Sequence, residues 1–362
     1  MGVLEIIGWA CIAIYTIWIV YLVMQWTTAR ASVAAEETHI DIAVIIPFRN
    51  ESENLNELLT ILTKELHHVP HVKIILVDDQ SDDNSLEVAK QFSSTSTLVL
   101  SNQVQPGKKG ALHTGILHAN VEWIITLDAD TAPRREWLVQ VARHIEAHQA
   151  ADLLIFPVWM EDEKQLFTRL QALEWMSVIG VTGGMAMGGH PILCNGANLA
   201  FRKDMYSAFH AERKDWNLAS GDDFFLLEYA REVIWIHDRL AAVSIQGEPT
   251  LSSFIQQRIR WAGKTKHTQK NATTFFGSLV FLTNFLLILS IVLTTHWWMM
   301  WCVKALVDLI LLYAVSRWLC KTSWLPLYPL LALIYPCYAV CIPLLSLRES
   351  TTWKGREIRI SN

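Results

Sequence analysis

Apolar residues are concentrated at the two ends of the chain. Residues 6–24 carry no charge, and this run is close to the ~20 residues that a helix needs to cross a ~30 Å hydrocarbon core. Glu5 precedes the run and Arg30 follows it, so the positive-inside rule places the N-terminus outside and residue 30 onward in the cytosol. Residues 29–31 resemble a signal-peptide cleavage site, but no Lys or Arg precedes the run, which favours an uncleaved anchor.

Three apolar segments close the chain, at residues 275–293, 297–319 and 324–347. The second contains Lys304 and Asp308, which lie four residues apart and therefore on one helix face. We expect these two charges to neutralise each other inside a helix bundle. A role in handling substrate is the alternative, because ionisable residues inside a membrane are costly.

The last apolar segment is rich in proline and is flanked by basic residues. Basic residues follow both the second and the third segment, and the positive-inside rule places both flanks in the cytosol. Three full crossings would leave the final flank outside. We therefore predict that residues 324–347 re-enter as a hairpin bent near Pro336, which returns Lys354 and Arg356 to the cytosolic side. A plain third crossing is the alternative.

Between the apolar ends, residues 40–270 alternate short apolar runs with amphipathic stretches. Near-continuous apolar strands separated by helices predict an α/β domain whose mostly parallel sheet is covered on both faces. Ligands of such sheets bind beyond the carboxyl ends of the strands, and polar clusters occur there at residues 47–51, 78–83 and 128–130. The predicted parts are an N-terminal anchor, the α/β domain, a C-terminal membrane region and a basic tail, at residues 1–30, 31–270, 271–347 and 348–362.

The amino-acid composition excludes several other classes of protein. Hydrophobic residues make up 52% and charged residues 18% of the chain, with a net charge of -5. These values exclude a disordered chain, a collagen-like fibre and a highly charged nucleic-acid binder. The six cysteines form no CxxC pair, and most lie in apolar runs. We therefore expect buried free thiols rather than a disulfide framework or a zinc site.

Two acidic clusters follow predicted strands. Asp128 and Asp130 come directly after the strand at residues 123–127. Two carboxylates can hold Mg²⁺, which fills its other positions with water and phosphate oxygens; a solvated turn is the alternative. Asp78 and Asp79 follow the predicted strand at residues 74–77. A carboxylate at this strand end can accept hydrogen bonds from a base or a ribose. The alternative there is an Asp-rich turn that caps the next helix.

Three further groups of residues have chemistry that suits a diphosphate or an acceptor. Lys108 opens a helix after a glycine and could contact a diphosphate, although no P-loop pattern is present. Asp223 opens another helix and is either a general base or a helix-terminus acid. Arg260 and Trp261 belong either to a basic aromatic interface helix or to a site in which Arg260 neutralises a departing diphosphate and Trp261 lines the acceptor channel.

In this order the clusters resemble the family-2 glycosyltransferases of GT-A fold, over residues 41–265. The residues that carry the resemblance are VIIPFRNE, VDDQSDD, GKKGAL, DAD, NGANLAFRK, GDDFFL and QRIRW. The last fits the QxxRW motif. The flanking apolar segments resemble the membrane-bound branch, and residues 353–356 resemble a C-terminal motif of ceramide-glucosyltransferase-like and carotenoid-glycosyltransferase-like members. Gly221 stands where Thr or Ala is usual.

The resemblance implies a role for each matching position. Catalysis is assigned to Asp223 as the base and to Arg260. Metal binding, by Mg²⁺ or Mn²⁺, is assigned to Asp128 and Asp130. The nucleotide-sugar site comprises Pro47, Arg49, Glu51, Val77, Asp79, Lys108, Asp128 and Ala129. The acceptor and diphosphate site comprises Asn195, Gly196, Asp222, Gln257 and Trp261.

One candidate base with no second nucleophilic carboxylate indicates a single displacement with inversion. We expect transfer of one sugar, from a UDP-sugar, to a lipid or membrane-embedded acceptor. The enzyme would be a multi-pass protein of the cytoplasmic membrane with its catalytic domain in the cytosol, and with no nucleic-acid or obligate protein partner. The alternatives are a processive polysaccharide synthase, which also uses QxxRW, and a catalytically inactive scaffold of the same fold.

Overall fold

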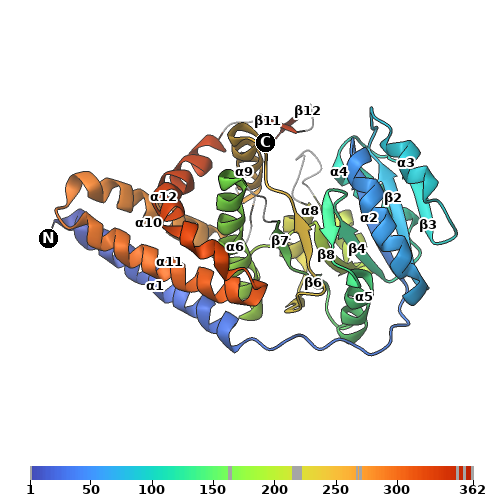
Figure 1. Ribbon diagram of the computed structural model, residues 1–362, viewed down its shortest axis with the longest axis horizontal. Helices are drawn as coiled ribbons and strands as arrows, with labels where there is room; N and C mark the ends of the chain where they lie inside the picture. The colour runs from blue at the N-terminus through green and yellow to red at the C-terminus, as the bar shows by residue number, and fades with distance from the viewer. Residues whose placement is uncertain are drawn as a thin grey trace. The chain divides into compact units, whose positions relative to one another are not determined.

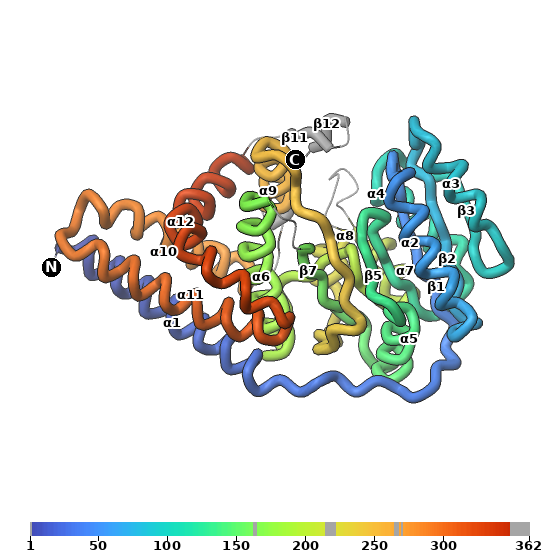
Figure 2. The backbone as a smooth tube through the Cα atoms, in the orientation of Figure 1, coloured from blue at the N-terminus to red at the C-terminus, as the bar shows by residue number. Residues whose placement is uncertain are grey.

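The computed structural model describes residues 2–161, 165–213, 222–265, 268, 271–347, 350–353 and 356–359. The chain forms two compact units. The first, the α/β unit, comprises Arg30–Glu161 and Cys194–Gln246, and the second, the helical unit, comprises Met1–Ala29, Asp162–Leu193 and Gly247–Asn362. Figure 1 labels their elements, and Figure 2 follows the backbone from end to end.

The α/β unit is built on a seven-stranded sheet with the strand order β3-β2-β1-β4-β8-β6-β9. In that order the strands are Thr97–Ser101, Val72–Asp78, Ile42–Phe48, Trp123–Leu127, Asn198–Arg202, Leu153–Ile155 and Val233–Trp235. β1 pairs in parallel with β2 and β4, and β2 with β3, whereas β8 is antiparallel to β4 and β6. The predicted α/β class with a mostly parallel sheet is confirmed. All residues of β1 are buried, as a strand covered on both faces requires.

Helices and a small second sheet complete this unit. The helices are α2 (Ser52–Glu65), α3 (Ser85–Gln91), α4 (Lys108–His118), α5 (Trp137–Ala147), α7 (Lys203–Glu212) and α8 (Asp222–Tyr229), with the 3-10 turn η1 (Leu66–His68). The small sheet has the order β5-β10-β7, with strands Thr131–Pro133, Val243–Ile245 and Val158–Met160. α4 approaches β1 so closely that a Cβ on Gly115 would lie 2.6 Å from Ile45. The absence of a side chain at Gly115 therefore allows α4, which begins at Lys108, to lie close against β1.

The helical unit contains α1 (Val3–Thr28), α6 (Leu166–Met187), α9 (Leu251–Thr265), α10 (Asn271–Leu293), α11 (Trp297–Leu319), the 3-10 helix η2 (Thr322–Leu327) and α12 (Tyr328–Leu345). β11 (Ser350–Trp353) and β12 (Arg356–Arg359) form an antiparallel pair. Within the described residues, four helical segments are long and apolar enough to cross a membrane, at Val3–Thr28, Asn271–Leu293, Trp297–Leu319 and Thr322–Leu345. This confirms the predicted arrangement of one N-terminal and three C-terminal apolar segments.

The last apolar segment differs from the predicted hairpin. α12 stays helical through Pro336 and Pro343, so the expectation of a non-helical bend at Pro336 is wrong. Proline leaves one carbonyl unpaired in a helix, but it does not have to end the helix when neighbouring elements support it. α12 packs against α9, α10 and η2, and β11 also contacts α9. The beginning of the tail thus lies beside α9, whereas Lys354 is outside the described residues.

Two other features of the helical unit could not be read from the order of residues. Residues 162–193 and 247–270 fall within the predicted α/β domain by position, yet α6 and α9 pack with the apolar helices.

The six cysteines are free, as expected. Cys11 is buried, but the expectation of buried thiols is wrong for four others, which are exposed: Cys302, Cys337 and Cys341 on helices, and Cys320 directly after α11.

Candidate functional site

The polar residues that follow β1, β2 and β4 lie at one edge of the large sheet. β1 and β2 are in parallel register, with Pro47 opposite Val77 and Phe48 opposite Asp78. β4 is parallel to β1 on its other side, so the residues after Leu127 emerge at the same edge. Three strand ends that the sequence places far apart are therefore neighbours.

Arg49 fixes the turn that follows β2. Its buried guanidinium donates through Nη1 to the carbonyl oxygens of Asp79 and Gln80, at 3.0 and 2.7 Å, and through Nη2 to Asp82 at 2.8 Å. Glu51 is also buried; its backbone N–H donates to Ser85 Oγ at 2.8 Å. Asp82, in the turn after β2, is thus the ion-pair partner of Arg49. The ends of β1 and β2 form one connected wall.

Asp79 holds the loop that leads to Lys108. Its carboxylate accepts hydrogen bonds from Asn102 Nδ2 at 2.8 Å and from the Gly107 N–H at 2.8 and 2.9 Å. Gly107 has a φ of 111°, a backbone conformation that favours glycine. Asn102 was missed from the sequence, although its position directly after β3 is the same signal that identified Asp79 after β2.

Lys108 joins the carboxylates that follow β4 and open α8. Its ammonium forms an ion pair with Asp128, and the two side chains are 32% and 27% exposed. Burial acts to lower the pKa of Lys108, but the carboxylates of Asp128, Asp223 and Asp130 outweigh it and raise that pKa above its ordinary value. Lys108 is therefore charged at every physiological pH. One ammonium and three carboxylates share this corner of the α/β unit, which we call the acid cluster.

The two adjacent acids of α8 have different environments. Asp223 accepts hydrogen bonds from the Gly196 N–H at 3.2 Å and the Phe224 N–H at 2.9 Å. A Cβ on Gly196 would lie 3.2 Å from the Cβ of Asp223, so the glycine permits this close approach. Asp222 instead pairs with Arg213 at 2.7 Å, and the Arg213 side chain is fully buried.

The remaining predicted residues of this unit lie beside these groups. Ala129 is buried, and Asp130 is exposed directly after it. Asn195 is half-buried, and its Oδ1 accepts the N–H of Ala197 at 3.0 Å. No group of three or more His, Cys, Asp or Glu side chains that could hold a metal is found in the described part of the chain. The carboxylates of Asp128 and Asp130 are hard oxygen ligands, and two of them suffice when phosphate and water fill the other positions of Mg²⁺ or Mn²⁺.

The QxxRW residues belong to the helical unit, on α9. Gln257 donates to Glu248 Oε1 at 2.7 Å and accepts from Arg258 Nη1 at 2.5 Å. Arg258 also pairs with Glu174 of α6 at 2.6 Å, and both side chains are buried. The Arg258 guanidinium lies 4.3 Å from the ring centre of Trp261. The motif is therefore tied to α6 through a residue that the sequence interpretation passed over.

The pKa of Arg258 also reflects its ion pair with Glu174. Burial acts to lower the pKa of Arg258, but Glu174 outweighs it and raises that pKa. Tyr338 of α12 donates to the other oxygen of Glu174 at 3.3 Å. Three helices thus meet at a single ion pair, which stabilises the position of Gln257 and Trp261. Arg258 and Glu174 are separated in the sequence and match no motif, so no sequence signal marked them.

Comparison with known proteins agrees with this architecture. The model of the family "Glycosyl transferase family 2" matches residues 43–209. The match supports a family-2 glycosyltransferase domain over these residues, and the mixed sheet of the α/β unit has a GT-A-like arrangement.

Three similar proteins show how far the likeness extends. Glycosyltransferase AglE of Haloferax volcanii is 32% identical over 99 residues, which are 27% of this chain and 33% of that protein. A poly-beta-1,6-N-acetyl-D-glucosamine synthase of Staphylococcus epidermidis is 22% identical over 61% of this chain and 53% of its own length. The mannosyltransferase PcManGT from Pyrobaculum calidifontis, solved in complex with GDP-Man and Mn²⁺, is 14% identical with a TM-score of 0.58, covering 92% of this chain and 97% of that one. The chain spans between about a third and a half of the length of these two sequence relatives.

Proposed function

We propose that this protein is an inverting, metal-dependent glycosyltransferase that moves one sugar from a nucleotide-sugar to a lipid or membrane-embedded acceptor. The observation that carries the proposal is the acid cluster, in which Lys108 is paired with Asp128 and is also influenced by Asp130 and Asp223. The cluster lies at the carboxyl edge of the sheet in a family-2 domain. Ligands of open α/β sheets bind at that edge.

The donor would occupy the edge formed by β1, β2 and β4. Arg49 and Asp79 organise the turn and loop that would flank the nucleoside, with Pro47, Glu51 and Val77 as neighbouring wall residues. The PcManGT structure was solved with GDP-Man and Mn²⁺, which supports the classes of ligand, a nucleotide-sugar and a divalent cation. A UDP-sugar remains the donor that we propose.

Asp128 and Asp130 would hold the cation beside the diphosphate. When bound, a divalent cation neutralises negative charge that develops on the departing diphosphate. Lys108 adds a second positive charge from the opening of α4. In the free protein Lys108 neutralises Asp128, so an incoming diphosphate would compete with Asp128 for this ammonium.

Asp223 would take the proton from the acceptor hydroxyl. The backbone N–H groups of Gly196 and Phe224 donate to its carboxylate and orient it. Asp222 is already paired with buried Arg213 and is therefore less suited to this role. A single base without a second nucleophilic carboxylate supports one displacement with inversion.

A lipid acceptor fits the helical unit. Four of its segments are long and apolar enough to cross a membrane, and α9 carries Gln257, Arg260 and Trp261. We propose that the protein is embedded in the cytoplasmic membrane, with the α/β unit in the cytosol. The narrower placement in a ceramide- or carotenoid-glycosyltransferase-like branch depends on residues 353–356, of which Lys354 and Gly355 are outside the described residues.

Processive polymer synthesis is a second candidate. It is favoured by the similarity to the Staphylococcus epidermidis synthase, which extends over 61% of this chain. The two functions differ in their product. A single transfer yields one glycolipid of defined mass, whereas a synthase yields a ladder of polymer lengths from the same donor.

The test uses the full chain reconstituted in lipid nanodiscs. UDP-glucose, UDP-galactose, UDP-N-acetylglucosamine and GDP-mannose are supplied one at a time with Mn²⁺ or Mg²⁺, and a chelated sample of each is the control. We expect nucleotide release with one donor, only with metal, and a lipid product one sugar heavier by mass spectrometry. Release that resists chelation would contradict metal dependence. Absence of release with every donor would favour the inactive scaffold.

A further inference from the structure

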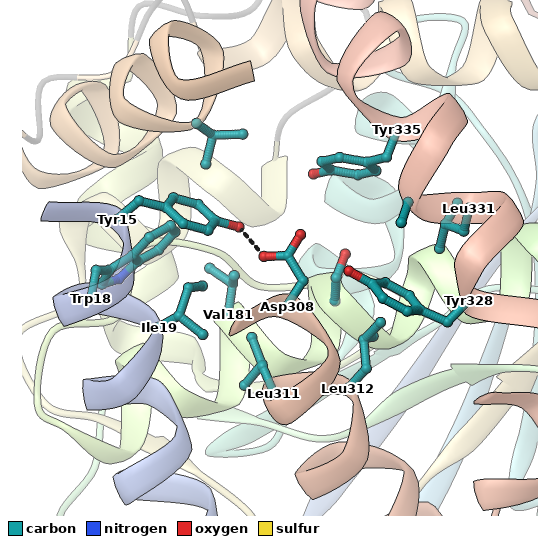
Figure 3. Close-up of a pocket in the computed structure, with 13 residues that line it drawn as sticks. Tyr15, Trp18, Ile19, Val181, Asp308, Leu311, Leu312, Tyr328, Leu331 and Tyr335 are labelled. Carbon is teal, nitrogen blue, oxygen red and sulfur yellow. Dashed lines mark hydrogen bonds between the residues drawn. The ribbon is translucent and has the colours of Figure 1, made fainter. Parts of the chain in front are cut away.

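The helical unit contains a second polar site, which is separate from the acid cluster and from α9. A cavity of about 60 Å³ is lined by residues of α1, α6, α10, α11 and α12 (Figure 3). Tyr15 lies near the middle of α1, Val280 near the middle of α10 and Asp308 near the middle of α11. The cavity is therefore about half-way along three of the apolar helices.

The polar groups of this cavity converge on Asp308. Tyr15 donates its hydroxyl to Asp308 Oδ1 at 2.8 Å, and Lys304 pairs with Asp308 Oδ2 at 2.5 Å. The Lys304 ammonium also lies 4.9 Å from the ring centre of Tyr335. Tyr328 donates to the carbonyl oxygen of Ala305 at 2.7 Å. Figure 3 shows the polar ends of Tyr15, Asp308, Tyr328 and Tyr335 directed into one space.

The pairing of Lys304 with Asp308 does not by itself explain why tyrosine hydroxyls gather around it. Lys304 and Asp308 lie on the same helix, so their pairing by itself ties α11 to no neighbour. Within the described part of the chain, the hydroxyl of Tyr335 has no hydrogen-bond partner, although it lines the cavity. A polar group in apolar surroundings is costly without a partner. The missing partner is therefore expected to come from whatever occupies the cavity.

We propose that this cavity binds the hydroxyl group of a neutral membrane lipid. A hydroxyl can donate to Asp308 and accept from Tyr335 at the same time, which satisfies both groups. Val181, Leu311 and Leu331 provide apolar walls for the adjoining carbons. The site lies wholly in the helical unit, and its occupation requires no nucleotide-sugar, so the proposal extends beyond the glycosyltransferase activity.

Charge and size restrict the ligand to this class. Lys304 and Asp308 neutralise each other, so a phosphate would face the Asp308 carboxylate and a choline would face the Lys304 ammonium. One water needs about 10–15 Å³ of such a cavity. The cavity therefore has room for more than one water-sized group, which suits an alcohol and its first carbons.

The experiment measures photolabelling of the full chain in dioleoyl-phosphatidylcholine nanodiscs without donor or metal. The probe is a sixteen-carbon primary alcohol that carries a diazirine near the hydroxyl and a terminal alkyne, and its methyl ether is the matched control. We expect the alcohol to label peptides that contain Asp308 or Tyr335. The ether, which cannot donate to Asp308, should label them about two- to tenfold less, as the loss of one hydrogen bond predicts.

Two variants test the cavity itself. Tyr335→Phe removes only the hydroxyl and should lower labelling by about two- to tenfold, whereas Tyr313→Phe, on the exposed side of α11, should leave it unchanged. Ala332→Leu fills the cavity without touching its polar groups and should abolish labelling. Equal labelling by alcohol and ether, or normal labelling of both Tyr335→Phe and Ala332→Leu, would overturn the proposal and leave a cavity filled by water. Donor hydrolysis is measured on separate portions of the same preparations after donor and metal are added, so failure of this site is distinct from failure of the enzyme activity.

Discussion

Two Lys–Asp pairs among the described residues differ in their surroundings. Lys108 and Asp128, in the α/β unit, are 32% and 27% exposed, whereas Lys304 and Asp308, in the helical unit, are 6% and 17% exposed. Asp130 and Asp223 also act on Lys108, so one positive charge faces three negative ones. Lys304 and Asp308 balance each other and are joined by tyrosine hydroxyls. The same two residue types therefore produce a site that attracts cations and a site that favours a neutral ligand.

The largest expected effects are a loss of turnover when the Lys108–Asp128 pair is broken and a loss of stability when the Lys304–Asp308 pair is broken. Asp128→Ala should reduce transfer by about 10³ with little change in melting temperature, because its side chain is partly exposed and Lys108 keeps two other carboxylates nearby. Asp308→Ala should instead destabilise the protein by about 3–5 kcal/mol, because Lys304 is left buried without a counter-charge. Turnover and thermal melting in nanodiscs check both, with exposed Asp41→Ala as the control. If Asp128→Ala lost stability but kept its activity, the assignment of Asp128 to catalysis would be wrong.

A smaller effect distinguishes the adjacent acids of α8. Asp223→Asn should lower turnover by about 10² and leave donor affinity little changed, because the amide cannot take a proton. Asp222→Asn should act mainly on stability, because it removes the partner of buried Arg213. Donor titration and single-turnover rates check the difference. A variant at Asp223 that lost only donor affinity would move this residue to the nucleotide site.

The buried pair of α9 and α6 should respond to a conservative change. Arg258→Lys keeps the charge but loses the forked contact to Glu174 and Gln257 and the guanidinium contact with Trp261. We expect a loss of stability of about 1–2 kcal/mol and a higher KM for the acceptor, with donor hydrolysis by the acid cluster unchanged. A parallel fall in donor hydrolysis would show that Arg258 serves the donor site as well.

The smallest effect is a pH dependence of stability in the α/β unit. Burial, together with His210 and Arg213, lowers the pKa of His113 to about 4, against a small opposing effect of Asp222. The folded state thus favours neutral His113, and its contribution is complete above about pH 6.5 and is lost as the pH falls towards 4. Because the ring is half-buried, we expect on the order of 1 kcal/mol. Urea unfolding of His113→Phe between pH 4 and 7 should show a weaker pH dependence than the native chain.

The local pattern was sufficient to predict the sheet edge and most of its chemistry. Near-continuous apolar runs predicted β1, β2 and β4, and polar residues at or directly after their ends predicted the residues at the carboxyl edge of the sheet. The roles of neighbouring residues were not predictable. Asp222 and Asp223 are equivalent in the sequence, and only the burial of Arg213 beside Asp222 separates them. Arg258 was overlooked in favour of Arg260 because its partner Glu174 lies 84 residues away.

The sequence by itself determined the α/β class, the apolar helices and the order of the acidic clusters, because strand burial, helix length and strand-end chemistry are local properties of the chain. The tertiary structure determined which charged side chains lie close enough to neutralise one another. It placed α6 and α9 with the apolar helices, gathered three carboxylates around Lys108, and surrounded Asp308 with tyrosines from α1 and α12. These outcomes depend on distances between segments far apart in the chain. Electrostatic energy varies with those distances and with burial, neither of which a linear pattern of residues specifies.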